Sequence, residues 1–113
     1  MDPSLSDDWT QAGALEDLPD GKGVQVEVAG LPVLLVRSGG AVFAIGDRCT
    51  HQGSRLDRGP VKLAGTLHTV TCPAHGSVFR LEDGAVVRGP AAEPVAAYDA
   101  RVVDGRVKVR PRG

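Results

Sequence analysis

Three two-residue turns set the pattern of this sequence. Gly39-Gly40, Asp83-Gly84 and Asp104-Gly105 each separate short runs in which apolar residues recur at alternate positions. Asp-Gly and Gly-Gly pairs tolerate the positive φ angles of tight hairpin turns, and a period of two places the apolar side chains of a strand on one face. The pattern predicts an all-β, antiparallel fold of about eight to ten short strands.

Two further runs support this prediction. Val24–Val28 reads VQVEV, with three valines on one face, and Thr66–Cys72 alternates and is rich in β-branched residues. Only Ala14–Leu18, with the sequence ALEDL, suggests a single helical turn. At 113 residues the chain is expected to form one domain, residues 1–113.

Charge and hydropathy exclude some functions. The net charge of −1 argues against a nucleic-acid partner. No apolar run is long enough to span a bilayer, and the acidic start MDPSLSDDW is unlike a secretory signal, so we expect a cytoplasmic protein with no membrane partner. Residues 46–90 nevertheless hold six basic and four acidic groups. This surplus is either scattered solvated charge or a basic rim, including Arg48, Arg55, Arg58 and Arg88, that attracts an acidic partner.

Both cysteines of the chain occur beside a histidine. CTHQGSRL carries Cys49 and His51, CPAHGSVF carries Cys72 and His75, and a glycine follows each pair. Two such loops could bring two sulfurs and two imidazoles to one metal site. The alternatives are buried free thiols, a disulfide, which a cytosolic location disfavours, and histidines that are simply exposed.

Two cysteines and two histidines also suit a tetrahedral Zn²⁺ ion. Common zinc spacings, however, place like residues together, whereas here each stretch supplies one thiol and one imidazole. The mixed pairs favour a binuclear site in which each iron receives one ligand from each loop, as in a [2Fe–2S] centre where two histidines replace two cysteines on one iron.

The two stretches, CTHQGS and CPAHGSVF, resemble the motif of the Rieske family, and the resemblance covers roughly residues 8–110. It implies an antiparallel β-sandwich of several short sheets, with a two-loop cluster-binding subdomain at about residues 46–90. It also implies one [2Fe–2S] cluster. Cys49 and Cys72 would bind one iron, and His51 and His75 would bind the other. The long gap between the loops suggests an extended hairpin around Val61–Leu67.

The resemblance also assigns residues around the cluster. High-potential members carry a disulfide where this chain has Ser54 and Ala74. Ser77 matches a serine that donates to a cluster sulfur, but Phe79 replaces the tyrosine that does so. We therefore predict a midpoint potential nearer to about −150 mV than to about +300 mV.

Other residues have two interpretations. Leu56 and Phe79 either shield the cluster or are ordinary core residues, and Gly89-Pro90 is either a third loop over the cluster or a simple turn. His68 is predicted to be a plain surface histidine, and Trp9 to pack against the N-terminal strand.

The function implied by the resemblance is that of a soluble, monomeric one-electron carrier, not an enzyme by itself. It would pass electrons from a flavin-dependent reductase to a terminal oxygenase, either a ring-hydroxylating dioxygenase or a similar monooxygenase. With neutral imidazoles, the charges of two ferric ions, two sulfides and two thiolates cancel, and reduction makes the cluster −1. The alternatives are a small subunit of an assimilatory nitrite reductase-type complex and a structural zinc-binding module.

Overall fold

The computed structural model describes residues 9–112; the acidic start at residues 1–8 and the final Gly113 lie outside this range. The described residues form ten strands and one turn of 3-10 helix, which confirms the all-β prediction and the single helical turn. The elements are β1 (Thr10–Ala14), η1 (Leu15–Asp17), β2 (Gly23–Val28), β3 (Leu31–Ser38), β4 (Ala41–Gly46), β5 (Val61–Ala64), β6 (Leu67–Thr71), β7 (Val78–Arg80), β8 (Val86–Arg88), β9 (Ala97–Val103) and β10 (Arg106–Pro111).

The predicted hairpins are all present. Gly39-Gly40 joins β3 to β4, Asp83-Gly84 lies in the turn between β7 and β8, and Asp104-Gly105 joins β9 to β10. Asp104 has φ 53° and Gly105 φ 76°, the left-handed conformations that an Asp-Gly turn requires. The extended hairpin predicted around Val61–Leu67 is formed by β5 and β6.

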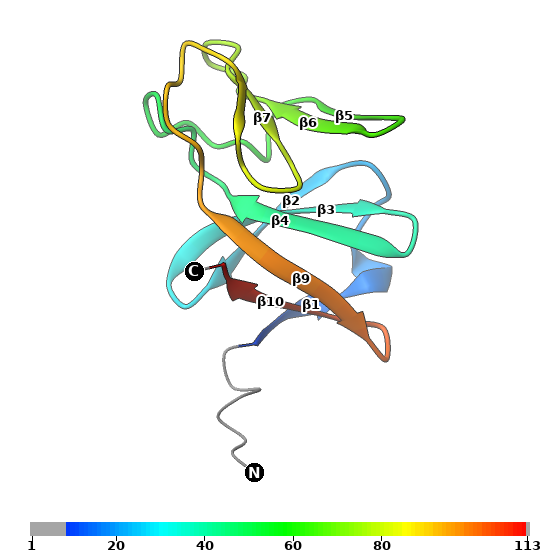
Figure 1. The fold of residues 1–113 in the computed structure, drawn as a ribbon. Helices are drawn as coiled ribbons and strands as arrows, with labels where there is room; N and C mark the ends of the chain where they lie inside the picture. Colours follow the sequence, from blue (N-terminus) through cyan, green and yellow to red (C-terminus); the bar gives the residue numbers. More distant parts are fainter. Residues whose placement is uncertain (1–8, 113) are drawn as a thin grey trace.

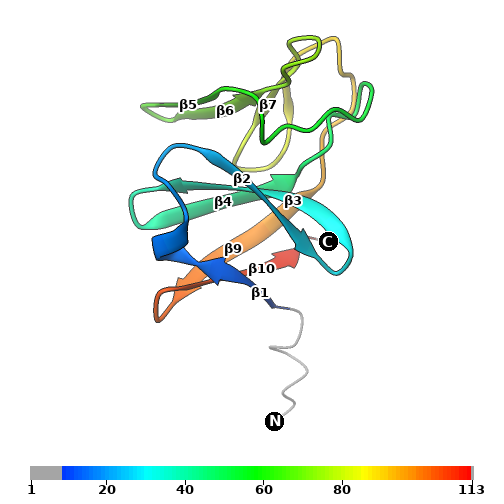
Figure 2. The ribbon, with the colours of Figure 1, turned by 180° about the vertical axis from the view of Figure 1, so that it is seen from behind.

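The strands form two antiparallel sheets. The first has six strands in the order β1-β10-β9-β4-β3-β2, and its two edge strands approach each other, so the sheet curls. The second has four strands in the order β5-β6-β7-β8. Figures 1 and 2 show the smaller sheet as a separate layer over β2, β3 and β4, with the loops that join the layers gathered at one end.

β3 is buried on both faces, which explains its uninterrupted apolar run PVLLV. Leu34 and Val36 face the four-stranded sheet, where they share a core with Phe79. Val33 and Leu35 face the interior of the curled sheet. Both cysteines belong to the core between the sheets, so the predicted ligand loops are anchored in it.

His68 departs from the prediction. It is half-buried, its ring lies 4.9 Å from that of Phe43, and its Nδ1 pairs with the carboxylate of Glu82. The prediction of a plain surface histidine is therefore wrong. Like the fully buried Val70 two residues later, His68 is on the face of β6 that is turned toward the six-stranded sheet.

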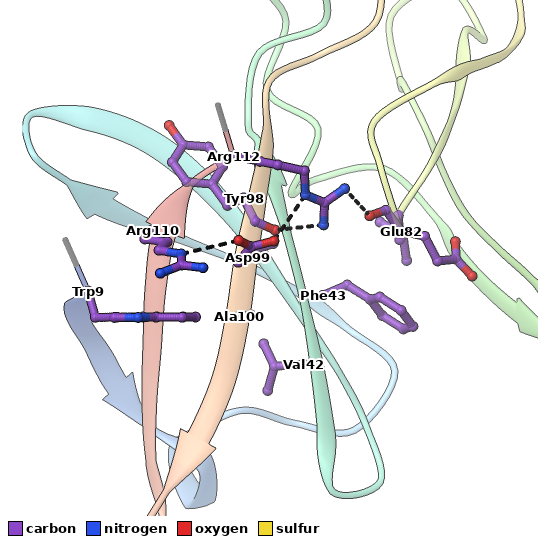
Figure 3. A pocket seen from close by; sticks show the side chains of 11 residues that line it. Trp9, Val42, Phe43, Glu82, Tyr98, Asp99, Ala100, Arg110 and Arg112 are labelled. Atoms are coloured by element: carbon purple, nitrogen blue, oxygen red, sulfur yellow. Dashed lines mark hydrogen bonds and ion pairs between the residues drawn. The ribbon is translucent and has the colours of Figure 1, made fainter. Parts of the chain in front are cut away.

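The end of the chain ties the two sheets together. The backbone N–H of Arg112 donates to Ala97 at 3.0 Å, and its guanidinium donates to Asp99 at 3.0 Å and to the carbonyl of Glu82 at 3.2 Å. These contacts border a cavity of about 430 Å³ (Figure 3). At its edge, the guanidinium groups of Arg101 and Arg110 lie 4.2 and 4.5 Å from the Trp9 ring, which fastens the start of β1 as predicted.

Candidate metal centre

The first ligand loop is closed by two backbone hydrogen bonds. The N–H of Cys49 donates to the carbonyl of Ser54 at 2.8 Å, and the N–H of Gly53 donates back to the carbonyl of Cys49 at 2.7 Å. Gly53 has φ 77°, a conformation that side chains with a Cβ adopt at a cost of about 1–2 kcal/mol. The glycine therefore lets the chain reverse directly after His51.

The second ligand loop repeats this backbone. The N–H of Cys72 donates to the carbonyl of Ser77 at 2.7 Å, and the N–H of Gly76, at φ 82°, donates to the carbonyl of Cys72 at 3.0 Å. In both loops the glycine comes four residues after the cysteine and the serine five, although the histidine is displaced by one position. The two stretches therefore form the same turn, but the histidine is the second residue after the cysteine in the first loop and the third in the second loop.

The loops separate the two kinds of ligand. Cys49 and Cys72 are each 2% exposed and form no disulfide. His51 and His75 are exposed, and their rings meet edge to face with centroids 5.0 Å apart. The structure therefore brings all four predicted ligands to one end of the molecule, with sulfur inside and nitrogen at the surface.

The surroundings of Cys72 favour a thiolate. Burial raises the pKa of this thiol, but the backbone N–H groups of Ala74 and His75, followed by the side chains of Cys49 and Ser54, lower it by more. The pKa of Cys72 consequently lies below its ordinary value. Only a thiolate binds iron well, so the loop is prepared for a metal ligand.

Residues 9–112 contain no group of three or more Cys, His, Asp or Glu side chains placed to hold a single ion. A binuclear cluster requires only two protein ligands for each iron. The paired thiols and the adjacent imidazoles therefore fit a [2Fe–2S] cluster, in which the cysteines would hold one iron and the histidines the other.

The structure places Leu56 and Phe79, the apolar residues predicted near the cluster, in the buried core. Leu56 and Phe79 are fully buried and belong to the core that contains the two cysteines, so they are core residues that also border the candidate site. Gly89 and Pro90 are exposed and joined by a cis peptide bond. Ala91 and Val95, which follow them, are the residues of this third loop that pack beside the cysteines.

Two hydroxyl groups attach the third loop to the ligand loops. The Oγ of Ser77 accepts the N–H of Ala91 at 2.9 Å, and the hydroxyl of Thr50 donates to the carbonyl of Glu93 at 2.6 Å. Sequence reasoning identified Ser77 but missed the roles of Thr50, Ala91 and Val95. Their only signal is proximity in sequence to Cys49 and to Gly89-Pro90.

Asp47 is a further residue that sequence reasoning missed. Its side chain is fully buried, and it accepts the N–H of Asp57 at 2.7 Å and the amide of Gln25 at 2.5 Å. Burial, followed by the neighbouring Asp57 carboxyl, raises the pKa of Asp47 to about 6. The guanidinium of Arg55 holds the pKa of Asp57 below its ordinary value. Asp47 therefore closes residues 47–57 around the first ligand loop.

Asp47→Asn is expected to stabilise the protein above pH 7. Because the folded-state pKa of Asp47 is raised from 3.8 to about 6, its contribution is full below pH 3.8 and is lost as the pH rises through about 6. The neutral amide removes the buried charge, its oxygen can still accept the N–H of Asp57, and its NH2 can donate to the oxygen of Gln25 once that amide turns over. We therefore expect a gain of about 1–2 kcal/mol at pH 8 and little at pH 4. Melting temperatures of both proteins at the two pH values test this. An equal loss of stability at both would contradict it.

An antiparallel β domain that presents two Cys/His loops at one end has the architecture of a Rieske-type iron–sulfur protein. Residues 8–99 match the family model for the Rieske [2Fe–2S] domain. The chain belongs to this family, whose cofactor is a [2Fe–2S] cluster, and the predicted fold and cofactor are confirmed.

Similar proteins agree with this assignment. The anthranilate 1,2-dioxygenase ferredoxin subunit of Burkholderia cepacia is 31% identical over 102 residues, covering 90% of this chain and 91% of the relative. The ferredoxin of carbazole 1,9a-dioxygenase from Nocardioides aromaticivorans IC177 is 31% identical with a TM-score of 0.85, covering 92% of this chain and 98% of that one.

Two other solved structures are informative. A Mycobacterium tuberculosis protein described as the small subunit of an NADH-dependent nitrite reductase is 34% identical with a TM-score of 0.82, covering 93% of this chain and 96% of that one. A complex of reduced oxygenase and oxidised ferredoxin of carbazole 1,9a-dioxygenase contains a chain that is 29% identical with a TM-score of 0.78, covering 90% of this chain and 92% of that one. No helix among residues 9–112 is long and apolar enough to cross a membrane.

Proposed function

We propose that this protein is a cytoplasmic, monomeric one-electron carrier that receives electrons from a flavin-dependent reductase and delivers them to a terminal oxygenase. Cys49 and Cys72 bind one iron of its cluster, and His51 and His75 bind the other. The observation that carries the proposal is the convergence of two buried free thiols and two exposed, adjacent imidazoles at one end of the fold.

The cysteines and the histidines have different roles in the site. When bound, the cluster accepts and releases one electron. The buried cysteines keep the inner side away from water, and the exposed rings of His51 and His75 offer the shortest path to a partner. The third loop is held by Ser77 and Thr50 and shares the core of the cysteines through Ala91 and Val95, while His51 and His75 remain exposed.

Beyond the four candidate ligands, the part of the chain that the structure describes holds no group of side chains placed to bind a further metal ion. The chain has three histidines, and the third, His68, is paired with Glu82 between the sheets. The sequence also lacks a glycine-rich dinucleotide fingerprint. An electron taken up here must therefore leave to another protein, as the relatives named as dioxygenase ferredoxin subunits suggest.

A second candidate function is that of a small subunit of a nitrite reductase. The similarity to the Mycobacterium tuberculosis protein favours it. The two functions differ in the acceptor. The reduced protein should support substrate oxidation by a ring-hydroxylating oxygenase in the first case and nitrite reduction by a large reductase subunit in the second. Assays with both acceptors, each with a reductase and NADH, distinguish them.

The cluster itself is tested on the purified protein. We expect a red-brown protein with two irons and two sulfides per chain. After reduction, its electron paramagnetic resonance signal should show the lower average g of mixed cysteine and histidine ligation. A colourless protein that contains a single zinc ion would overturn the proposal.

Ser77→Ala is expected to lower both stability and midpoint potential. Loss of Oγ leaves the buried N–H of Ala91 without a partner, which should cost about 1–3 kcal/mol. It also removes the hydroxyl that the Rieske resemblance places against a cluster sulfur, and one such bond of about 1.4 kcal/mol corresponds to about 60 mV. Calorimetry and redox titration measure the two effects. A melting temperature that falls while the potential stays constant would limit Ser77 to holding the third loop.

A further inference from the structure

In the cluster-binding half, every carboxylate has a partner within the chain, whereas three cations have none among residues 9–112. Residues 46–90 contain four carboxylates, and each one has a partner within the chain. The pairs are Asp47 with Gln25 and the N–H of Asp57, Asp57 with Arg55, Glu82 with His68, and Asp83 with Arg80. Three exposed cations, Arg58, Lys62 and Arg88, have no ion-pair partner among residues 9–112. The surplus that the sequence shows is therefore available to an outside partner.

Two of these cations flank an apolar groove. Lys62 and Arg88 line a cavity of about 280 Å³ on the outer face of the four-stranded sheet, together with Leu67, Val78 and Val87. Leu67 is 47% exposed and Val87 49%, which makes them two of the four large apolar residues that stand exposed in residues 9–112. No carboxylate lines the groove. Exposed apolar side chains with a charged border are typical of a protein–protein contact.

The groove begins at the second ligand loop. Thr71, which lines it, directly precedes Cys72, and Val78 directly follows Ser77. Val78 pairs with Thr71 of β6 on one side and with Arg88 of β8 on the other. These three residues therefore form one row across the sheet, which runs from the end of β6 at the second ligand loop to Arg88. The groove therefore adjoins the second ligand loop, which carries the exposed His75.

We propose that this groove docks the electron donor, and that the donor presents an acidic surface with an apolar side chain at its centre. The inference rests on the proposed carrier function. The ligand set makes the oxidised cluster neutral and the reduced cluster −1, so reduction weakens attraction to an acidic partner. A donor must bind the oxidised carrier and release the reduced one, whereas an acceptor must do the reverse. The basic groove therefore suits a donor.

Stopped-flow reduction tests the charges. Reduced flavodoxin, chosen as an acidic one-electron flavoprotein, would reduce the wild type, the Lys62→Glu/Arg88→Glu double variant and an Arg106→Glu control. Arg106 is an exposed cation at the start of β10 with no ion-pair partner in the described range 9–112, and its hairpin lies far from the ligand loops in Figure 1. The photoreduced 5-deazariboflavin radical, a small uncharged donor, reports any change in the cluster itself.

We expect the wild-type rate with flavodoxin to fall about tenfold between 20 and 300 mM salt, because screening removes electrostatic steering. The double variant should react about tenfold more slowly at low salt and lose most of its salt dependence, while Arg106→Glu behaves as wild type. Rates with deazariboflavin should be equal for all three proteins. If the double variant keeps the wild-type flavodoxin rate, or if Arg106→Glu slows it as much, the docking proposal is wrong.

A binding measurement tests the direction of transfer. Oxidised flavodoxin should bind the oxidised carrier about two- to fivefold more tightly than the reduced carrier, and the double variant should lose this difference. Equal or tighter binding to the reduced form would overturn the assignment to a donor. The paramagnetic signal and visible spectrum are recorded for every variant. If the wild type lacks these cluster signals, the carrier function itself is refuted. If the signals are present but the double variant binds flavodoxin as the wild type does, only the proposed docking at the groove is refuted.

Discussion

Cys72→Ser is expected to abolish the cluster. The serine hydroxyl is almost never deprotonated near neutral pH, and the variant would leave one iron of the cluster with a single thiolate, that of Cys49. The substituted residue would also be buried beside the N–H groups of Ala74 and His75, which favour a negative sulfur. We expect a colourless protein with less than about a tenth of the wild-type iron and sulfide, and no paramagnetic signal after reduction.

His68→Asn is the matched control for the histidine ligands. His68 has the same side chain as the two candidate ligands, but it lies between the sheets with Glu82 and Phe43 and not in a ligand loop. His75→Asn should lose the cluster, whereas His68→Asn should retain it and lose about 1 kcal/mol of stability with its hydrogen bond to Glu82. Equal iron contents in His75→Asn and the wild type would contradict the proposed ligand set.

Gly59→Ala is expected to have the largest effect on stability. A Cβ at Gly59 would lie 1.8 Å from the carbonyl oxygen of Thr71 and 3.1 Å from Cδ of Pro73. The oxygen is backbone at the end of β6, and the N–H of Thr71 already donates to Pro60 at 3.0 Å, so neither segment can shift alone. We expect a loss of about 3 kcal/mol or more, and a fall in melting temperature of about 12 °C.

The close approach at Gly59 also joins the exit of the first ligand loop to the start of the second. Separating them should lower cluster occupancy, which iron analysis measures beside the melting curve. Gly40→Ala is the control, because nothing lies within 4 Å of a Cβ there and its φ is ordinary. A melting temperature for Gly59→Ala as high as that of Gly40→Ala would show that the contact can relax.

The hairpins and the ligand loops could be predicted because their signals are local. A two-residue turn and an alternating strand depend on residues within a few positions of each other, which is why Gly39-Gly40 and Asp104-Gly105 were assigned correctly. The equal placing of glycine and serine after Cys49 and Cys72 likewise sets both loop backbones. The spacing of Cys49 and His51 and of Cys72 and His75 made these four residues candidates, and the Rieske resemblance assigned them as ligands.

The remaining features depend on contacts between distant segments. Nothing near His68 in sequence reveals that Glu82 and Phe43 will meet it, because pairing of β6 with its neighbours decides which face is buried. The need for glycine at position 59 arises only when Thr71 approaches it. Asp47 becomes a buried acid for the same reason, since Gln25 lies 22 residues away.

The amino-acid sequence by itself determined the β class, the positions of the hairpins and the two turns that carry sulfur and nitrogen, because short-range backbone preferences decide these features. The tertiary structure alone decided that the thiols are buried while the imidazoles are exposed, and which of the six cations of residues 46–90 remain without partners. Burial and charge pairing are properties of surfaces brought together by folding, and neighbours along the chain do not specify them.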